Sequence, residues 1–335
     1  MTERRVARLD PSMRAMVRTR RELFYDAGAD PAIDRPAHVR SGSGLAWLGS
    51  RLVIAQDDAS FLALLDASLA HVSSITLDHV VDGARQFDAV RGNKKQKLDL
   101  EACSVLTCDG REVLVAWGSG SLPARERLVV LERDADRARV VEAQSLYASL
   151  RARIEFAGSE MNIEGAAPIG GDRVRIFQRG NGAPHGDLVP IDAMGDLDLR
   201  ALLAWIADPT RPVPALRDVV QWDLGRVSDV RLTFTDACPA PGGSIAYLAA
   251  AEASPDAIED GVVVGVAMGV IDARGEARYA LVTTPDGAPF VGKCEGLAWV
   301  PGATGKRALV VVDRDDPGAP SELLELDLEG FPNGS

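Results

Sequence analysis

Short hydrophobic runs separated by polar turns make up most of this chain. Runs rich in Val, Ile and Leu, such as residues 52–55, 113–117 and 308–312, alternate with stretches that contain Gly, Asp or Pro. Runs of this length and composition are typical of β-strands joined by hairpins. The pattern therefore predicts an all-β fold made of small antiparallel sheets.

One short phrase recurs along the chain, in which a Ser or Glu is followed by small and apolar residues. Successive copies are 58, 63, 64 and 67 residues apart, and they begin at Ser43, Glu101, Glu164, Ser228 and Glu295. Nearly constant self-similarity predicts a repeat fold. A unit of about 60 residues with about four strands favours a propeller blade over the shorter coil of a β-solenoid.

We therefore expect a five-bladed β-propeller of four-stranded antiparallel blades, with six blades as the alternative. The whole chain, residues 1–335, forms one domain in this interpretation, and its modules start near residues 41, 97, 160, 226 and 292. Little chain remains after the last module. We therefore expect residues 1–40 to form an arm that supplies the outer strand closing the ring.

Two short helices are expected between modules, as decorations of the β framework. Residues 142–153 and 198–207 carry apolar residues at helical spacing. Asp196 and Asp198 are candidate N-caps of the second helix, and Pro209 is expected to end it.

Composition limits the location and the partners. The chain has 37 Lys and Arg against 49 Asp and Glu, a net charge of −12, which argues against nucleic acid because phosphate contacts need clustered cations. The basic segment over residues 1–21 is interpreted as a solvated arm. No run of 18 apolar residues occurs, and the N-terminal charges precede no apolar stretch, so we expect no membrane segment and a cytoplasmic location.

The four cysteines indicate free thiols rather than a disulfide framework or a zinc site. They form no CxxC pair, and intracellular thiols stay reduced. The alternative is one disulfide between Cys103 and Cys108, if these two residues face each other across a hairpin.

The recurring oxygens suggest a cation site. In a propeller the first strand of each blade lines the central channel, so the five opening residues would form a ring there. Like charges brought together raise each other's pKa or require a cation. Calcium, which takes 6 to 8 oxygen ligands, suits such a ring better than zinc. The alternative is that these residues hydrogen-bond to neighbouring backbone amides and tie blade to blade.

The order Ser, Glu, Glu, Ser, Glu on first strands resembles the calcium-dependent nucleotidase (soluble apyrase) family, with weaker similarity to phytase-like esterase propellers. Further matching motifs are the stretch 52–58, which ends in Asp57 and Asp58, the Phe-Gln-Arg ending at Arg179, and the Lys-Cys-Glu ending at Glu295. The resemblance implies five blades, a central calcium, and nucleoside di- and triphosphates at the channel mouth. It also implies Asp57, Asp58 and Arg179 as the catalytic candidates.

A rim of basic residues is predicted independently of the resemblance. One or more basic residues precede four of the ring positions, namely Arg40, Lys97, Arg226 and Lys293. If these gather at one mouth of the channel, they favour a small anionic ligand. The alternative is that each pairs with a nearby carboxylate such as Asp99 or Asp229.

Three classes of function follow from the sequence. The first is a calcium-binding propeller that acts as a metal-dependent hydrolase of phosphate anhydrides or esters. The second is a non-catalytic propeller that binds a small anion or a protein partner, with a structural central cation. The third is an interaction scaffold without metal.

Overall fold

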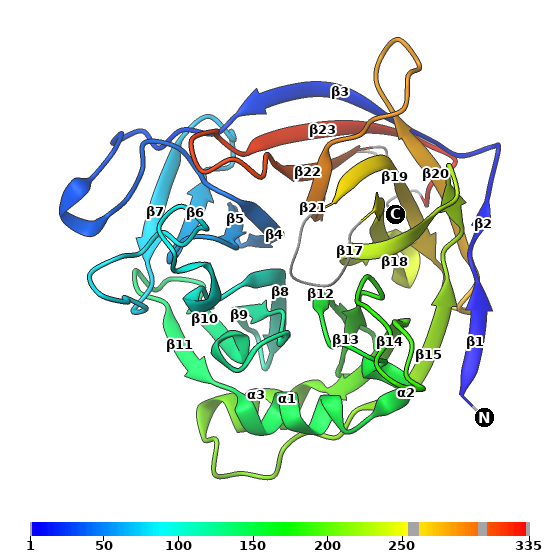
Figure 1. The fold of residues 1–335 in the computed structure, drawn as a ribbon, viewed down its shortest axis with the longest axis horizontal. Coiled ribbons are helices and arrows are strands. Elements are labelled where there is room, and N and C mark those ends of the chain that lie inside the picture. The colour runs from blue at the N-terminus through cyan, green and yellow to red at the C-terminus, as the bar shows by residue number, and fades with distance from the viewer. Residues whose placement is uncertain (1, 254–260, 301–306, 333–335) are drawn as a thin grey trace.

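A computed structural model of the chain describes residues 2–253, 261–300 and 307–332. The structure is mostly β, and its antiparallel sheets are arranged around a centre in a propeller-like manner (Figure 1). None of the helices in these ranges has the length and apolar character needed to span a bilayer. The sequence-based prediction of small antiparallel sheets is confirmed.

Two groups of four strands follow one another in simple meander order. The first comprises β4 (Gly42–Leu48), β5 (Arg51–Gln56), β6 (Phe61–Leu65) and β7 (Val72–Thr76). The second comprises β8 (Leu100–Cys108), β9 (Arg111–Gly118), β10 (Arg127–Glu132) and β11 (Arg139–Glu142). In both, consecutive strands pair antiparallel, as hairpin connections require.

The remaining strands form three more groups, each extended by strands from elsewhere. The third has β12 (Ile163–Ile169), β13 (Arg173–Gln178), β14 (Asp192–Asp198) and β15 (Arg217–Asp223). The fourth has β16 (Arg226–Val227), β17 (Val230–Ala240), β18 (Ser244–Ala253), β19 (Val262–Ile271) and β20 (Ala277–Thr283). The fifth has β21 (Lys293–Trp299), β22 (Arg307–Asp313) and β23 (Glu322–Glu329).

Five strands, which we call the inner strands, surround the centre: β4, β8, β12, β17 and β21. Each lies against the next, and β21 lies against β4 (Figure 1). A short parallel pairing between β20 and β3 joins the last two groups into one ten-stranded sheet, so that hydrogen bonding alone defines four sheets.

The N-terminal arm runs along the outer edges of three groups (Figure 1). Its strands are β1 (Glu3–Val6), which pairs with β15, β2 (Arg8–Leu9), which pairs with β20, and β3 (Arg14–Glu22), which pairs antiparallel with β23. Three basic residues of β3 meet acidic partners on β23, as in the ion pair of Arg20 with Glu322 at 2.5 Å. The basic composition of the arm therefore complements the sheet edge that it covers.

The structure contains both expected helices and a short one between them. α1 (Gln144–Arg151) and α3 (Leu199–Ala207) fall within the expected ranges, and α2 (Ile154–Ala157) follows α1. Asp198 caps α3 by accepting a hydrogen bond from the Ala201 amide at 2.7 Å. Asp196 is not a cap, because its buried carboxylate pairs with Arg173 and Arg175.

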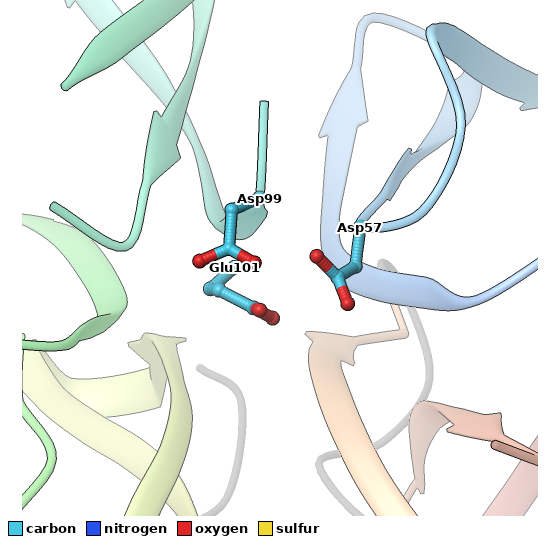
Figure 2. Close-up of side chains that lie close together, drawn as sticks. All are labelled: Asp57, Asp99 and Glu101. Carbon is cyan, nitrogen blue, oxygen red and sulfur yellow. The ribbon is translucent and has the colours of Figure 1, made fainter. Parts of the chain in front are cut away.

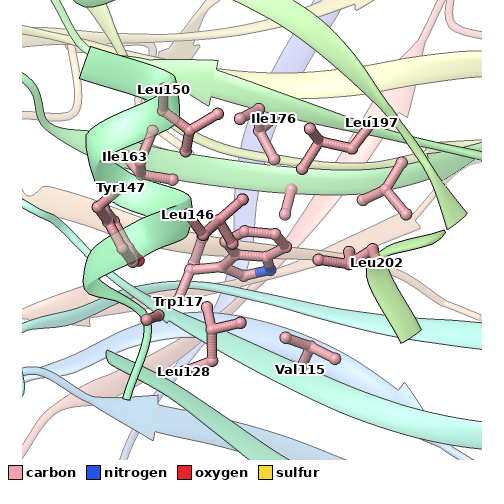
Figure 3. Packing of buried hydrophobic residues seen from close by; sticks show 14 of the residues in the cluster. Val115, Trp117, Leu128, Leu146, Tyr147, Leu150, Ile163, Ile176, Leu197 and Leu202 are labelled. Carbon is pink, nitrogen blue, oxygen red and sulfur yellow. The ribbon is translucent and has the colours of Figure 1, made fainter. Parts of the chain in front are cut away.

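These helices form part of the core instead of decorating the surface. Trp117 of β9 is fully buried against Leu146 and Tyr147 of α1 and Leu202 of α3 (Figure 3). The helices thereby cover apolar surface between the second and third groups, which explains why both carry an apolar face.

The arm is expected to stabilise the fold through Val17 of β3, which is 6% exposed and packs in the core of the last two groups. Replacing Val17 by Asp buries an unpaired carboxylate and should lower the free energy of unfolding by about 3 kcal/mol. The exposed neighbour Met16, opposite Asp327, supplies the control. Met16→Lys should change the free energy of unfolding by less than about 0.5 kcal/mol. Equal denaturation midpoints for Val17→Asp and the unchanged chain would show that the arm contributes little.

Candidate metal centre in the central channel

Each inner strand carries a register shift where it approaches the centre. The shifts in β8, β12, β17 and β21 leave one residue out of the regular pairing, and the shift in β4 includes Ser43. Such β-bulges re-aim a side chain away from the regular ladder. The residues concerned are Ser43, Glu101, Glu164, Thr235 and Glu295.

Four of the five predicted ring residues are therefore inner-strand bulge residues, and the fifth requires correction. Ser228 lies in the hairpin turn between β16 and β17, where it is exposed and has a φ of 46°. Thr235 is the bulge residue of β17 and is fully buried. The two segments look alike in sequence, because Ser228-Asp229 and Thr235-Asp236 both pair a hydroxyl with an Asp.

The glycines that follow Ser43 and Glu295 are explained by close packing of the inner strands. A Cβ added at Gly296 would lie 1.8 Å from the Ser43 carbonyl oxygen, and one at Gly44 would lie 2.6 Å from the Cys103 amide nitrogen. Real contacts are longer than this, so a side chain at either position would force neighbouring strands apart. The repeated phrase thus combines a centre-facing oxygen with a close strand contact.

Three carboxylates converge at this point. One oxygen from each of Glu101, Glu164 and Glu295 lies within 4.8 Å of the others. Glu164 and Glu295 are only 2% and 4% exposed, and Glu164 Oε2 and both Glu295 oxygens have no hydrogen-bond partner within the described ranges. The same holds for the Thr235 hydroxyl, whereas Ser43 Oγ donates to the Leu100 carbonyl oxygen.

The proximity of the three buried glutamates makes their charged forms less favourable. Burial raises the pKa of Glu164 to about 7, although Arg179 opposes this change. Burial and the neighbouring Glu164 raise the pKa values of Glu101 and Glu295 well above the ordinary value for glutamate. Without a cation, this group is therefore expected to hold protons at neutral pH.

A second set of side chains lies at the mouth of the channel. Each comes at or just after the end of a strand that pairs with an inner strand. Asp57 after β5, Arg179 after β13 and Glu252 near the end of β18 line the same cavity as the ring, as does Asp313 at the end of β22. Figure 2 shows Asp57 facing Asp99 and Glu101 across this space.

The three catalytic candidates all form ion pairs. Lys97 Nζ lies 2.5 Å from Asp57 Oδ2 and 2.9 Å from Asp58 Oδ1. Arg179 pairs with Glu164 at 3.2 Å and also with Glu252. Each of the three candidates is therefore already engaged in an ion pair.

The predicted basic rim is only half assembled. Lys97 and Lys293 line the cavity. Arg40 is buried instead in a network with Asp88, 3.0 Å away, and the Phe87 carbonyl. Arg226 lies on the exposed β16 hairpin and donates to the Asp229 carbonyl. These two residues therefore do not form part of the channel mouth.

The cavity has a volume of about 50 Å³, which holds a few water molecules or an ion but not a nucleotide. Its lining includes seven carboxylates against five cationic side chains. With all of them ionised, the lining would carry a net charge of −2, equal and opposite to that of one divalent ion. The carboxylates are Asp57, Asp99, Glu101, Glu164, Glu252, Glu295 and Asp313, and the cations are Lys94, Lys97, Arg125, Arg179 and Lys293.

Sequence reasoning did not assign Asp99, Thr235, Glu252 or Asp313 to the site. The available signal was positional, because Asp57 and Asp313 follow the apolar second strands of their modules in the same way. The cysteines offer no ligand here: all four are free thiols in the structure, and no His or Cys is among the residues lining the described cavity.

A protein-family model described as a family of unknown function (DUF6929) matches residues 38–328. Among curated proteins, none matches the chain.

Solved structures that match the chain have low sequence identity. The allergen Mala s 1 of Malassezia sympodialis has 11% identity and a TM-score of 0.49, covering 89% of this chain and 97% of its own. The glutaminyl cyclase of Myxococcus xanthus has 13% identity and a TM-score of 0.45, covering 98% of this chain and 99% of its own. A luciferin-regenerating enzyme has 10% identity and a TM-score of 0.43, covering 88% and 95%. These likenesses carry no argument about activity, and the resemblance to the calcium-dependent nucleotidases stays a prediction.

The raised pKa values predict how the stability of the metal-free protein depends on pH. Folded Glu164 keeps its proton up to about pH 7, whereas an unfolded glutamate loses it near pH 4.3. The folded state thus binds more protons between these values, and stability falls as pH rises through that window. With chelator present, the melting temperature should drop by several degrees between pH 5 and pH 7.5.

Glu164→Gln should make this decline shallower, because the amide stays neutral at every pH. An identical pH profile for Glu164→Gln and the unchanged chain would contradict the assignment of a protonated Glu164.

Proposed function

The chain belongs to the DUF6929 family, and we propose that its function rests on one divalent cation held in the central channel by Glu101, Glu164 and Glu295. The observation that carries this proposal is the set of buried carboxylate oxygens on Glu164 and Glu295 that have no hydrogen-bond partner in the described part of the chain. A buried carboxylate oxygen without a hydrogen-bond partner is costly, and a cation among the three glutamates would satisfy these oxygens together.

Calcium is the ion that we propose. The donors around the convergence are carboxylate and hydroxyl oxygens, with the Thr235 hydroxyl also unpartnered in the described structure. Calcium accepts such oxygen ligands in flexible numbers, whereas zinc and copper favour nitrogen and sulfur.

We also propose that the five inner strands define five blades. The short β20–β3 pairing, over two residue pairs, lies at the outer edge and does not involve the inner strands. In this interpretation β3 is the outer strand of the last blade, and a central ion would hold β8, β12 and β21 together.

The first candidate function is hydrolysis of phosphate anhydrides or esters at the channel mouth. A bound divalent ion would polarise a phosphoryl oxygen or lower the pKa of a bound water. Burial raises the pKa of Asp57 well above the ordinary value for aspartate, which suits proton transfer near neutral pH. The cavity volume means that only one phosphoryl group could enter, with the remainder of a small anionic substrate outside.

The second candidate function is a non-catalytic propeller that binds a small anion or a protein partner, with the cation in a structural role. The observation that favours it is the ion pairing of Asp57, Asp58 and Arg179. These pairs occupy the groups that hydrolysis would need to accept a proton and to stabilise charge on the phosphate.

Calcium binding is expected to raise the melting temperature at pH 7.5 by about 5 °C or more at saturation, since binding to the folded state alone stabilises it. Glu295→Gln should weaken the affinity measured by calorimetry at least about tenfold. Thr235→Val should weaken it less, and Ser228→Ala, at the exposed hairpin, serves as a matched control with no change. Equal affinity for Glu295→Gln and the unchanged chain would rule out the proposed ligands.

A phosphate-release screen over nucleotides and small phosphate esters separates the two candidate functions. The hydrolase proposal predicts turnover that requires calcium and falls at least about 100-fold in Asp57→Asn, a loss typical of removing a proton-transfer group. Arg226→Ala should retain full activity. Calcium binding without any turnover would favour the structural cation.

A further inference from the structure

We propose that Lys97 takes the place of a second metal ion. Its ammonium group fills a second half of the acidic centre, formed by Asp57, Asp99 and Glu101, and thereby restricts the protein to one divalent ion. This inference rests on the proposed function for the identity of that one ion.

The ammonium group of Lys97 lies in a cage of carboxylate oxygens. Besides Asp57 and Asp58, its Nζ lies 2.8 Å from Asp99 Oδ1. The Lys97 side chain is only 5% exposed. Three carboxylates around a desolvated ammonium form an arrangement that would equally suit a small inorganic cation.

Two carboxylates of this cage, Asp57 and Asp99, also belong to a group with Glu101. One oxygen from each of Asp57, Asp99 and Glu101 lies within 4.8 Å of the others, as in the group of Glu101, Glu164 and Glu295. Glu101 belongs to both groups and lies between them. Two cation sites joined by a shared carboxylate are typical of two-metal centres, whose ions lie about 3.5–4 Å apart.

The ammonium group of Lys97 contacts three carboxylates, each at 2.9 Å or less. Lys293, the lysine nearest the other group, lies 3.8 Å from Glu295 Oε1 and has a shorter contact with Asp315, at 2.8 Å. The fixed charge of Lys97 would repel a divalent ion at the Asp57 side while leaving the Glu164 side available.

The consequence is a one-metal centre with a tethered cation beside it. Chelators can remove an ion but not a lysine. The loop that carries Asp57 therefore stays joined by the Lys97 contacts to the segment before β8 in the metal-free protein. Two-metal phosphoryl transfer is thereby excluded for this chain, and Lys97 acts as a specificity-determining residue for metal number.

The test is the number of Mn²⁺ ions bound to the full chain, measured by elemental analysis after gel filtration and by electron paramagnetic resonance. The unchanged protein should bind one ion with a mononuclear spectrum. Lys97→Ala should bind two ions with an exchange-coupled spectrum. Lys97→Arg, which keeps the positive charge, and Arg226→Ala, on the exposed hairpin, should each still bind one.

Two outcomes separate this inference from the proposed function. If Lys97→Ala binds the same number of ions as the unchanged protein, the inference is overturned whatever that number is. In the second outcome the unchanged protein binds no ion and Lys97→Ala binds one. If adding Asp99→Asn to Lys97→Ala abolishes this binding and adding Glu295→Gln does not, the inference stands while the proposed function fails.

Stability provides the second readout if Lys97→Ala folds poorly without metal. The proposal requires Mn²⁺ to replace the lost positive charge, so the variant should recover its melting temperature as Mn²⁺ is added and should reach two ions per chain. A variant that stays unfolded at saturating Mn²⁺ would contradict the proposal.

Discussion

The structure depends on the enforced proximity of buried carboxylates where the inner strands meet. Close packing at Gly44 and Gly296 brings the strand backbones together, and the bulges next to these positions place Glu101, Glu164 and Glu295 within reach of one another. Charges of one sign in so small a volume need protons or counter-charges. The Lys97 and Arg179 ion pairs and the raised pKa values are all consequences of this constraint.

Much of the fold could be predicted from the sequence because its signals are local. Strand runs and turns gave the antiparallel sheets, and helical spacing gave α1 and α3. The four-residue α2 has too few turns to produce a period. The number of blades is harder to define, because the N-terminal arm pairs with sheets distant in sequence and β3 joins two of them. Such long-range pairing leaves no local signature.

The site was predicted less completely than the fold. Ser43, Glu101, Glu164 and Glu295 were identified because each opens the repeated phrase and is followed by a small residue. Thr235 was missed because a similar dipeptide occurs at Ser228, and the bulge position in β17 depends on pairing with β18. Tertiary contacts decide which partners the basic residues bind. Arg40 pairs with Asp88 instead of reaching the channel mouth, and Lys97 pairs with Asp57, Asp58 and Asp99.

The central claim is that the three converging glutamates hold one divalent ion. The most direct measurement is anomalous X-ray scattering from a crystal grown with Mn²⁺ in place of calcium. The account predicts one strong anomalous peak within ligand distance of Glu101, Glu164 and Glu295, and no peak at the position of the Lys97 ammonium. No anomalous density among these glutamates at saturating Mn²⁺ would contradict it.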